Sequence, residues 1–196
     1  MQPILLASGS PRRREILENL GFIVHKISAE IDETPHDGEL AYDYVQRMAV
    51  EKNRAAIAQF GSTEQAILSA DTTVALNGHI LGKPDNAAHA HEILSALSGS
   101  THQVMTAVCV SRGGREWVAV QCSDVQFKPL SEQEIAAYIT SGEPMDKAGA
   151  YGIQGVGGVF VAHLSGSFTG VMGLPVFETL NLLREAGVDV PPFQAA

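Results

Sequence analysis

The sequence predicts an α/β protein with a mixed sheet. Short apolar runs with the composition of strands alternate along the chain with longer segments that have helical periodicity. The dipeptides Asn77-Gly78 and Gly113-Gly114 each join two apolar runs, which is typical of a two-residue β-hairpin. A chain of 196 residues, 45% of them hydrophobic, can bury the core of one α/β domain or of two small lobes.

Turn residues separate the elements expected in the first half of the chain. Pro11 suits the first turn of a helix because its missing N–H would be unpaired there, and the Ser10 side chain is expected to cap that helix. Asn77-Gly78 closes the hairpin that follows the long second helix. We expect strands at 4–7 and 22–27, helices at 11–20 and 39–60, and a hairpin formed by 66–76 and 79–83.

The second half of the chain has equally clear boundaries. Pro84 ends the first hairpin, and Ser131 with Glu134 matches the capping box that begins a helix. A glycine-rich segment, AGAYGIQGVGG, precedes the last strand. We expect helices at 87–97 and 131–141, a second hairpin formed by 104–112 and 115–127, a strand at 159–164 and a last helix after Pro175.

Composition argues against several classes of protein. The net charge of −9 disfavours a nucleic-acid-binding surface. No window approaches the about 18 consecutive apolar residues of a membrane span, so we expect no membrane contact and a cytoplasmic location. Cys109 and Cys122 lie in expected strands without metal-type spacing, which predicts buried, reduced thiols. His89 and His91 are two apart on a helix and are expected at the surface rather than on a metal.

Three arginines follow Pro11, at the helix end where positive charge is unfavourable. Each basic residue in a first turn costs up to roughly 1 kcal/mol. Arg14 can pair with Glu18 four residues on, whereas Arg12 and Arg13 have no such partner. A polyanion held by backbone N–H groups and guanidinium groups would make the arrangement favourable. The alternative is a solvated basic turn.

Asp71 is an acidic residue inside an otherwise apolar strand. A buried, unpaired carboxylate is very costly and strand interiors disfavour Asp, so this side chain needs a cation, a donor network or a proton. We expect a metal ligand or a general base. The alternative is an Asp at a strand end that is hydrogen-bonded to neighbouring Thr hydroxyls. Glu33, in the preceding loop, could supply a second carboxylate.

Lysines and one amide mark further candidate positions. Lys52 falls on the apolar stripe of helix 39–60, so its ammonium either snorkels to solvent or points into a cleft. Lys83 stands at a strand end before Pro84, where it can leave the sheet toward a ligand. Gln154 lies in the glycine-rich segment, where its amide could read a base edge and the glycines allow close approach to a ligand.

Several separated segments resemble the Maf family of nucleoside triphosphate pyrophosphatases, in that family's order. The resemblance implies an inosine triphosphatase-like α/β fold, with an elongated mixed sheet flanked by helices and two lobes around a nucleotide cleft. It covers the chain from residue 5 to about 180 and implies a single domain over 1–196. The segments are LASGSPRRREIL, SADTTVALNGHILGKP, LSGSTHQVMTAV, EPMDKAGAYGIQG and GLPVFETL.

The resemblance also implies an activity and a set of roles. Family members hydrolyse a nucleoside triphosphate to the monophosphate and diphosphate with a divalent cation, Mg²⁺ or Mn²⁺. The family further implies a homodimer and a link to inhibition of septum formation. By this resemblance the catalytic residues are Asp71 as proton acceptor, Lys52 and Lys83, the substrate-binding residues are Ser8, Arg12, Arg13, Thr72 and Gln154, and the metal ligands are Glu33 and Asp71.

Three positions resemble the branch of the family that acts on dTTP and UTP. They are Arg12 after Pro11, Thr72 after Asp71, and Gln154 in GIQG. Modified pyrimidine triphosphates are expected as further substrates. One alternative is a pyrophosphatase for 7-methyl-GTP or for nucleotides in general, which differs in base recognition. Another is a nucleotide-binding regulator of septum formation, which turnover with Mg²⁺ or Mn²⁺ would discriminate.

Overall fold

A seven-stranded mixed sheet is the centre of this protein, for which a computed structural model describes residues 3–28, 30–61 and 64–192. The strands are β1 (Ile4–Ala7), β2 (Val24–Ile27), β3 (Ile67–Leu76), β4 (His79–Leu81), β5 (Thr101–Arg112), β6 (Arg115–Phe127) and β7 (Val161–Ser165). Their order is β2-β1-β3-β5-β6-β7, and β4 pairs with β3 outside this path. The predicted mixed sheet is therefore confirmed.

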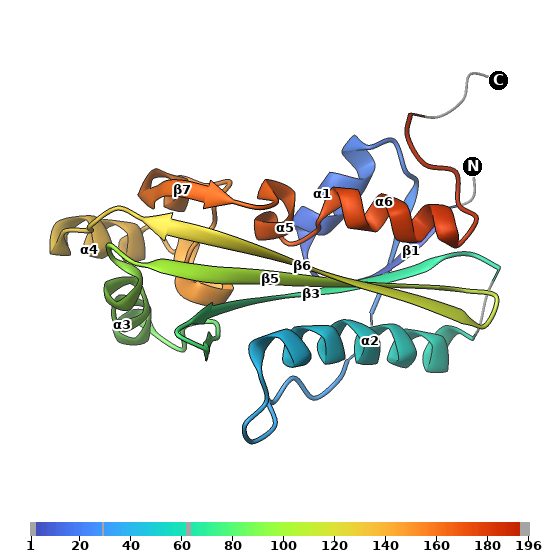
Figure 1. The fold of residues 1–196 in the computed structure, drawn as a ribbon, viewed down its shortest axis with the longest axis horizontal. Coiled ribbons are helices and arrows are strands. Elements are labelled where there is room, and N and C mark those ends of the chain that lie inside the picture. Colours follow the sequence, from blue (N-terminus) through green and yellow to red (C-terminus); the bar gives the residue numbers. More distant parts are fainter. Residues whose placement is uncertain (1–2, 29, 62–63, 193–196) are drawn as a thin grey trace.

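Helices lie on both faces of the sheet. Helix α2 covers one face, α1 and α6 lie on the other, and α3 and α4 lie together at one end (Figure 1). The helices are α1 (Pro11–Asn19), α2 (Ala41–Phe60), α3 (Ala87–Leu97), α4 (Glu132–Thr140), α5 (Phe168–Met172) and α6 (Val176–Glu185), with 3₁₀ turns η1 (Glu143–Asp146), η2 (Ala148–Ala150) and η3 (Val156–Phe160). None of the helices in the described ranges is long and apolar enough to cross a membrane.

The two edges of β3 are paired differently. One edge pairs with β5 without interruption over residues 67–75. The other edge pairs in parallel with β1 at residues 67–69 and antiparallel with β4 at residues 74–76. Between these two partners, no strand of the described chain pairs with residues 70–73 along this second edge. The sheet therefore has an opening in the middle of one of its longest strands.

Two separate apolar cores lie on either side of this opening. The first combines β1, α1, β2 and α6, with Leu6, Leu17 and Leu183 fully buried. The second combines α3, α4, β5, β6 and the glycine-rich segment. The strands β3, β5 and β6 run through the length of the molecule and connect the two halves (Figure 1). This arrangement confirms the predicted elongated sheet with two lobes.

Most local predictions are confirmed. The helix predicted at 87–97 has those bounds, and Ser131 and Glu134 form the reciprocal capping box. Both hairpins turn at the predicted dipeptides, Asn77-Gly78 and Gly113-Gly114, where all four residues have positive φ. Asparagine and glycine tolerate that backbone conformation better than other residues do, which explains why these turns could be recognised.

Other predictions are wrong. Ser10 is the N-cap residue of α1, but its side chain makes no capping hydrogen bond. Its backbone N–H donates to Ser8 Oγ at 3.2 Å. Cys122 is exposed rather than buried. It shares one face of β6 with Asp124 and Gln126, which are also exposed. The short helix α5 and the three 3₁₀ turns lie in segments where no helix was expected.

His102 is a buried histidine that the sequence did not single out. It lies on β5 with 1% of its surface exposed, and its Nε2 is 2.9 Å from the hydroxyl of Tyr151. The rings of Phe127 and Tyr151 pack edge-on against it. Its Nδ1 has no hydrogen-bond partner in the described part of the chain. Burial lowers the pKa of His102 to about 4, so the ring is neutral near pH 7.

We expect this histidine to make folding sensitive to acid. Because the folded-state pKa lies below the ordinary value of 6.5, the unfolded chain binds the proton more tightly, and stability falls as the pH drops from about 6.5 toward 4. Between pH 7 and pH 5 the wild type should lose about 2 kcal/mol more than His102→Gln. Urea unfolding at both pH values measures this difference. Equal losses would mean that His102 does not carry the effect.

Candidate active site

A cleft of about 640 Å³ lies at the opening in β3. Both lobes contribute to it, since its lining includes residues that follow β1, residues of α1 and α2, and the glycine-rich segment. Every site residue predicted from the sequence lines this cleft: Ser8, Arg12, Arg13, Glu33, Lys52, Asp71, Thr72, Lys83 and Gln154. The sheet explains the convergence, because Ala7 of β1 pairs with Ser69 and Leu81 of β4 pairs with Val74. The chain leaving each strand therefore reaches the opening.

The ammonium of Lys52 lies between two carboxylates. Its Nζ is 2.6 Å from Asp71 Oδ1 and 2.7 Å from Glu33 Oε1. The side chains of Lys52 and Asp71 are only 14% and 13% exposed. Lys52 therefore points into the cleft instead of snorkelling to solvent. Asp71 is stabilised by a cation and not by neighbouring Thr hydroxyls, which was the alternative reading of its position.

Glu33 is held charged by its surroundings. Partial burial raises its pKa, but the hydrogen bond from Lys52 and the positive charges of Lys52, Lys83 and Arg13 outweigh burial and leave the pKa below its usual value. Glu33 is therefore negatively charged near neutral pH. Two carboxylate groups share one ammonium at this site, and the excess negative charge would attract a further cation.

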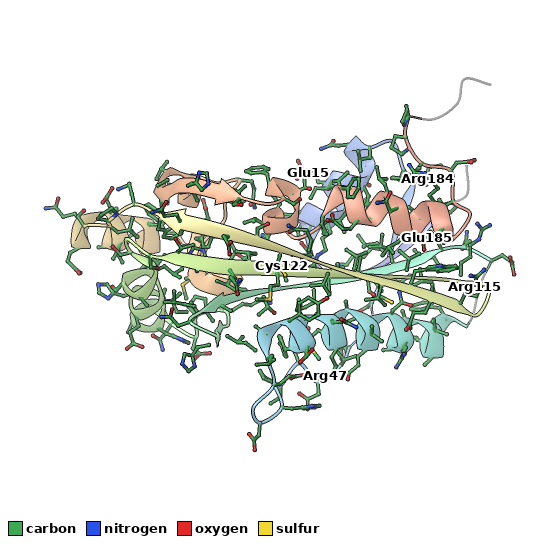
Figure 2. All side chains as sticks on the ribbon, in the orientation of Figure 1. Glu15, Arg47, Arg115, Cys122, Arg184 and Glu185 are labelled. Atoms are coloured by element: carbon green, nitrogen blue, oxygen red, sulfur yellow. The ribbon has the colours of Figure 1, made fainter. Side chains whose placement is uncertain are left out.

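The loop that carries Glu33 is tied to α2. The hydroxyl of Tyr44 donates to the carbonyl oxygen of Glu33 at 2.9 Å. Arg47, which lies on the side of α2 next to this loop, donates from Nη2 to the carbonyl oxygen of Thr34 at 3.1 Å (Figure 2). The same guanidinium binds both carboxylate oxygens of Glu39 at 2.6 Å, which lowers the pKa of Glu39 to about 2. These contacts fix the position of Glu33 at the cleft.

Arg13 is part of the scaffold of the site, through partners that are hydroxyl and carbonyl groups rather than an acidic side chain one turn along α1. It is 9% exposed and donates to Ser8 Oγ at 2.9 Å, to Thr72 Oγ1 at 3.0 Å and to the carbonyl oxygen of Gly173 at 2.7 Å. Burial lowers its pKa, and the negative charge of Asp71 opposes that change. Its planar fork joins the end of β1, the middle of β3 and the end of α5.

The remaining cations are more available to a ligand. Lys83 is exposed and forms no ion pair within residues 3–28, 30–61 and 64–192. Arg12 makes one long contact, 3.8 Å to Asp146 on the opposite lobe. Only Arg14 pairs as predicted, with Glu18 at 2.7 Å. Because Ser10 provides no side-chain cap, the first turn of α1 presents free N–H groups at the cleft, which suits an anion.

The carboxylate oxygens of Glu33 and Asp71 suit a divalent cation that is also bound by a phosphate. No group of three or more His, Cys, Asp or Glu side chains in the described ranges is placed to hold a metal alone. Glu33 and Asp71, however, already converge on one cation, the Lys52 ammonium. Mg²⁺ is commonly held by one or two carboxylates together with substrate phosphates and water. The carboxylate pair suits that mode of binding.

Sequence reasoning missed several residues of the site. Tyr44, Tyr151 and Asp146 line the cleft although no pattern marked them. Asp146 accepts a hydrogen bond from Lys147 at 2.6 Å and faces Arg12, which lowers its pKa. His89 and His91 lie at the surface, as predicted, and pair there with Asp85 and Glu132, the last from helix α4.

The chain is similar in sequence to several known proteins. The family model described as "Maf-like protein" matches residues 3–186. A "Nucleoside triphosphate pyrophosphatase" of Haemophilus ducreyi is 54% identical over 96% of this chain and 98% of its own. A "dTTP/UTP pyrophosphatase" of Pasteurella multocida is 55% identical over 94% and 96%, and that of Neisseria gonorrhoeae is 52% identical over 100% and 98%. Among solved structures, the Staphylococcus aureus Ham1 protein is 16% identical with a TM-score of 0.46, over 64% of this chain and 72% of its own.

The contacts of Arg13 predict a specific stability defect. In Arg13→Lys a single ammonium replaces a fork that satisfies Ser8, Thr72 and Gly173, so we expect the free energy of unfolding to fall by about 2 kcal/mol. Arg14→Lys, one residue along, should change it by less than about 0.5 kcal/mol because its ion pair is exposed. Urea unfolding of both variants tests this. Equal effects would contradict a scaffold role for Arg13.

Proposed function

This chain belongs to the Maf family, and we propose that it hydrolyses dTTP, UTP and modified pyrimidine nucleoside triphosphates to the nucleoside monophosphate and diphosphate. The observation that carries the proposal is the cleft itself. It brings the Asp71 carboxylate, several cations and the Gln154 amide together at the opening in β3. These are the groups needed for water activation, for binding of a triphosphate and for reading a base.

The triphosphate lies among the cations of the cleft in this proposal. Lys83 and Arg12 have little or no compensation from acidic side chains, so their charges are available to phosphate oxygens. The free N–H groups at the start of α1 add further donors. The negative charge of a triphosphate then explains the arginine turn that is unfavourable in the absence of a ligand. Arg13 contributes by holding Ser8 and Thr72 in place.

Asp71 is the proposed proton acceptor. Its Oδ1 is engaged by Lys52, while Oδ2 accepts no hydrogen bond from the described residues. Water attacks the α-phosphorus and transfers a proton to this carboxylate. The bond between the α-phosphorus and the bridging oxygen breaks, and its electron pair leaves with the diphosphate. Lys52 and Lys83 stabilise the negative charge that develops on the phosphate oxygens.

We propose Glu33 and Asp71 as the residues that hold a divalent cation, Mg²⁺ or Mn²⁺, together with phosphate oxygens. When bound, that cation would neutralise charge on the phosphates and favour ionisation of water. Lys52 holds both carboxylates close together before a metal ion binds, since its Nζ lies within 2.7 Å of each of them.

Base recognition is assigned to Gln154, with Arg12 and Thr72 nearby in the same cleft. The edge of uracil or thymine presents an acceptor, a donor and an acceptor in sequence. A Gln amide can both donate and accept, so together with backbone groups of the glycine-rich segment it can match this edge. The single domain, the homodimer and the cytoplasmic location stay predictions from the family resemblance.

A panel of nucleotides with detection of released diphosphate tests the function. In the presence of Mg²⁺ or Mn²⁺, dTTP and UTP should be hydrolysed with the highest kcat/KM. Preference for 7-methyl-GTP would reassign the base specificity. Binding of nucleotides without turnover under either metal would instead favour the regulator of septum formation.

Replacing the proposed base should remove activity without unfolding the protein. We expect Asp71→Asn to lower kcat for dTTP by about 10²–10⁴-fold, because the amide cannot accept the proton from water. Asp124→Asn is the matched control, since Asp124 is an exposed carboxylate on β6. Steady-state kinetics with unfolding curves measure both. An Asp71→Asn protein with more than half of the wild-type kcat would mean that Asp71 is structural.

A further inference from the structure

The backbone of the segment from Gly152 to Gly157 packs against the carboxylate of Glu143, which lies outside the cleft. Glu143, at the start of η1, accepts hydrogen bonds from the backbone N–H of Val156 at 3.0 Å and of Gly157 at 3.1 Å. Tyr138 of α4 donates its hydroxyl to the same carboxylate at 2.8 Å. That hydroxyl also accepts from the backbone N–H of Gly152 at 3.1 Å. Both ends of the segment are therefore anchored to one pair of side chains.

Glycines make this close approach possible. A Cβ at Gly155 would be 2.5 Å from Glu143 Oε1, and a Cβ at Gly157 would be 2.5 Å from the hydroxyl of Tyr138. Both distances are far below van der Waals contact. The glycines of the GIQGVG stretch therefore allow its backbone to contact Glu143 and Tyr138. This requirement is separate from any need for the backbone to approach a ligand.

The opposite side of the same segment faces the cleft. Gly152 and Gln154 line it, as does Tyr151, whereas Glu143, Val156 and Gly157 do not. The amide of Gln154 has no hydrogen-bond partner among the described residues, so nothing within that part of the chain orients it directly. Its position is set by its backbone, and that backbone is held by Glu143.

The charge of Glu143 matters for this anchoring. Burial raises its pKa, but the hydrogen bonds from Gly157, Val156 and Tyr138 outweigh burial and keep the pKa below its usual value. An ionised carboxylate accepts from all three donors at once. An amide of the same shape would turn one acceptor into an N–H₂ group that faces another N–H donor.

We propose that Glu143 is a positioning residue for base recognition: it holds the Gly152–Gly157 backbone so that the Gln154 amide meets the edge of a pyrimidine. This proposal rests on the proposed function, because it assigns the basis of selectivity within the same cleft. Glu143 touches neither the base nor the phosphates. If Glu143 had a purely structural role, its replacement would weaken folding or the binding of all ligands alike. If it positions Gln154, its replacement should weaken recognition of the base and leave binding of the triphosphate unchanged.

Glu143→Gln tests the proposal with a ligand that has a base and one that has none. Displacement of a positioning group by about 1 Å can cost on the order of 10²-fold. We therefore expect kcat/KM for dTTP to fall by about 10- to 100-fold. The preference for dTTP over dGTP should shrink, while the inhibition constant of inorganic tripolyphosphate should stay within about twofold. Glu185→Gln, an exposed carboxylate on α6 (Figure 2), is the matched control and should leave all three values unchanged.

A double-mutant cycle with Gln154→Ala separates an effect through Gln154 from an effect on folding. If Glu143 acts through Gln154, the double variant should have the dTTP preference of Gln154→Ala alone. Additive losses, or equal weakening of dTTP and tripolyphosphate, would overturn the proposal. If Glu143→Gln does not fold, Tyr138→Phe removes one of the same anchors and should shift the preference in the same direction. A wild-type protein without dTTP hydrolysis would refute the proposed function, whereas equal losses in an active protein refute only this role of Glu143.

Discussion

The incomplete pairing of β3 determines where everything else in the site lies. Two short strands, β1 and β4, share one edge of β3, and on that side residues 70–73 pair with no strand of the described ranges. Continuous pairing with β5 on the other edge keeps this part of the strand rigid. Polar side chains can therefore face the opening without interrupting the sheet. The loops that follow β1 and β4 bring Ser8 and Lys83, respectively, into the same cleft.

The cations of the cleft differ in how deeply they are buried and in which groups they contact. The buried cation, Arg13, donates to protein groups at the ends of β1 and α5 and in the middle of β3, and so joins these three elements at the cleft. Lys52 compensates two carboxylates that would otherwise repel each other. The exposed Lys83 and the half-buried Arg12 are the cations of the cleft with the least neutralisation by acidic side chains of the described residues. A polyanionic substrate would complete the balance of charges in an otherwise acidic protein.

Local chemistry made much of this structure predictable. Hairpin dipeptides, the capping box at Ser131 and the stripe position of Lys52 each depend on neighbours within a few residues. The partners of Arg13 and Glu143 depend on the folded chain: Gly173 is 160 residues from Arg13, and Val156 reaches Glu143 only because the glycine-rich segment turns back. The exposure of Cys122 likewise depends on which face of β6 is covered. Roles within the site came from the resemblance to a family and not from periodicity.

We propose that Asp71 activates water for attack on the α-phosphorus while the cations of the cleft stabilise diphosphate as the leaving group. Hydrolysis of dTTP in ¹⁸O-labelled water, with separation of the products by chromatography and mass spectrometry, tests it most directly. The account predicts that the label appears in dTMP and that diphosphate is unlabelled. Accumulation of dTDP, or label in the inorganic product, would contradict it.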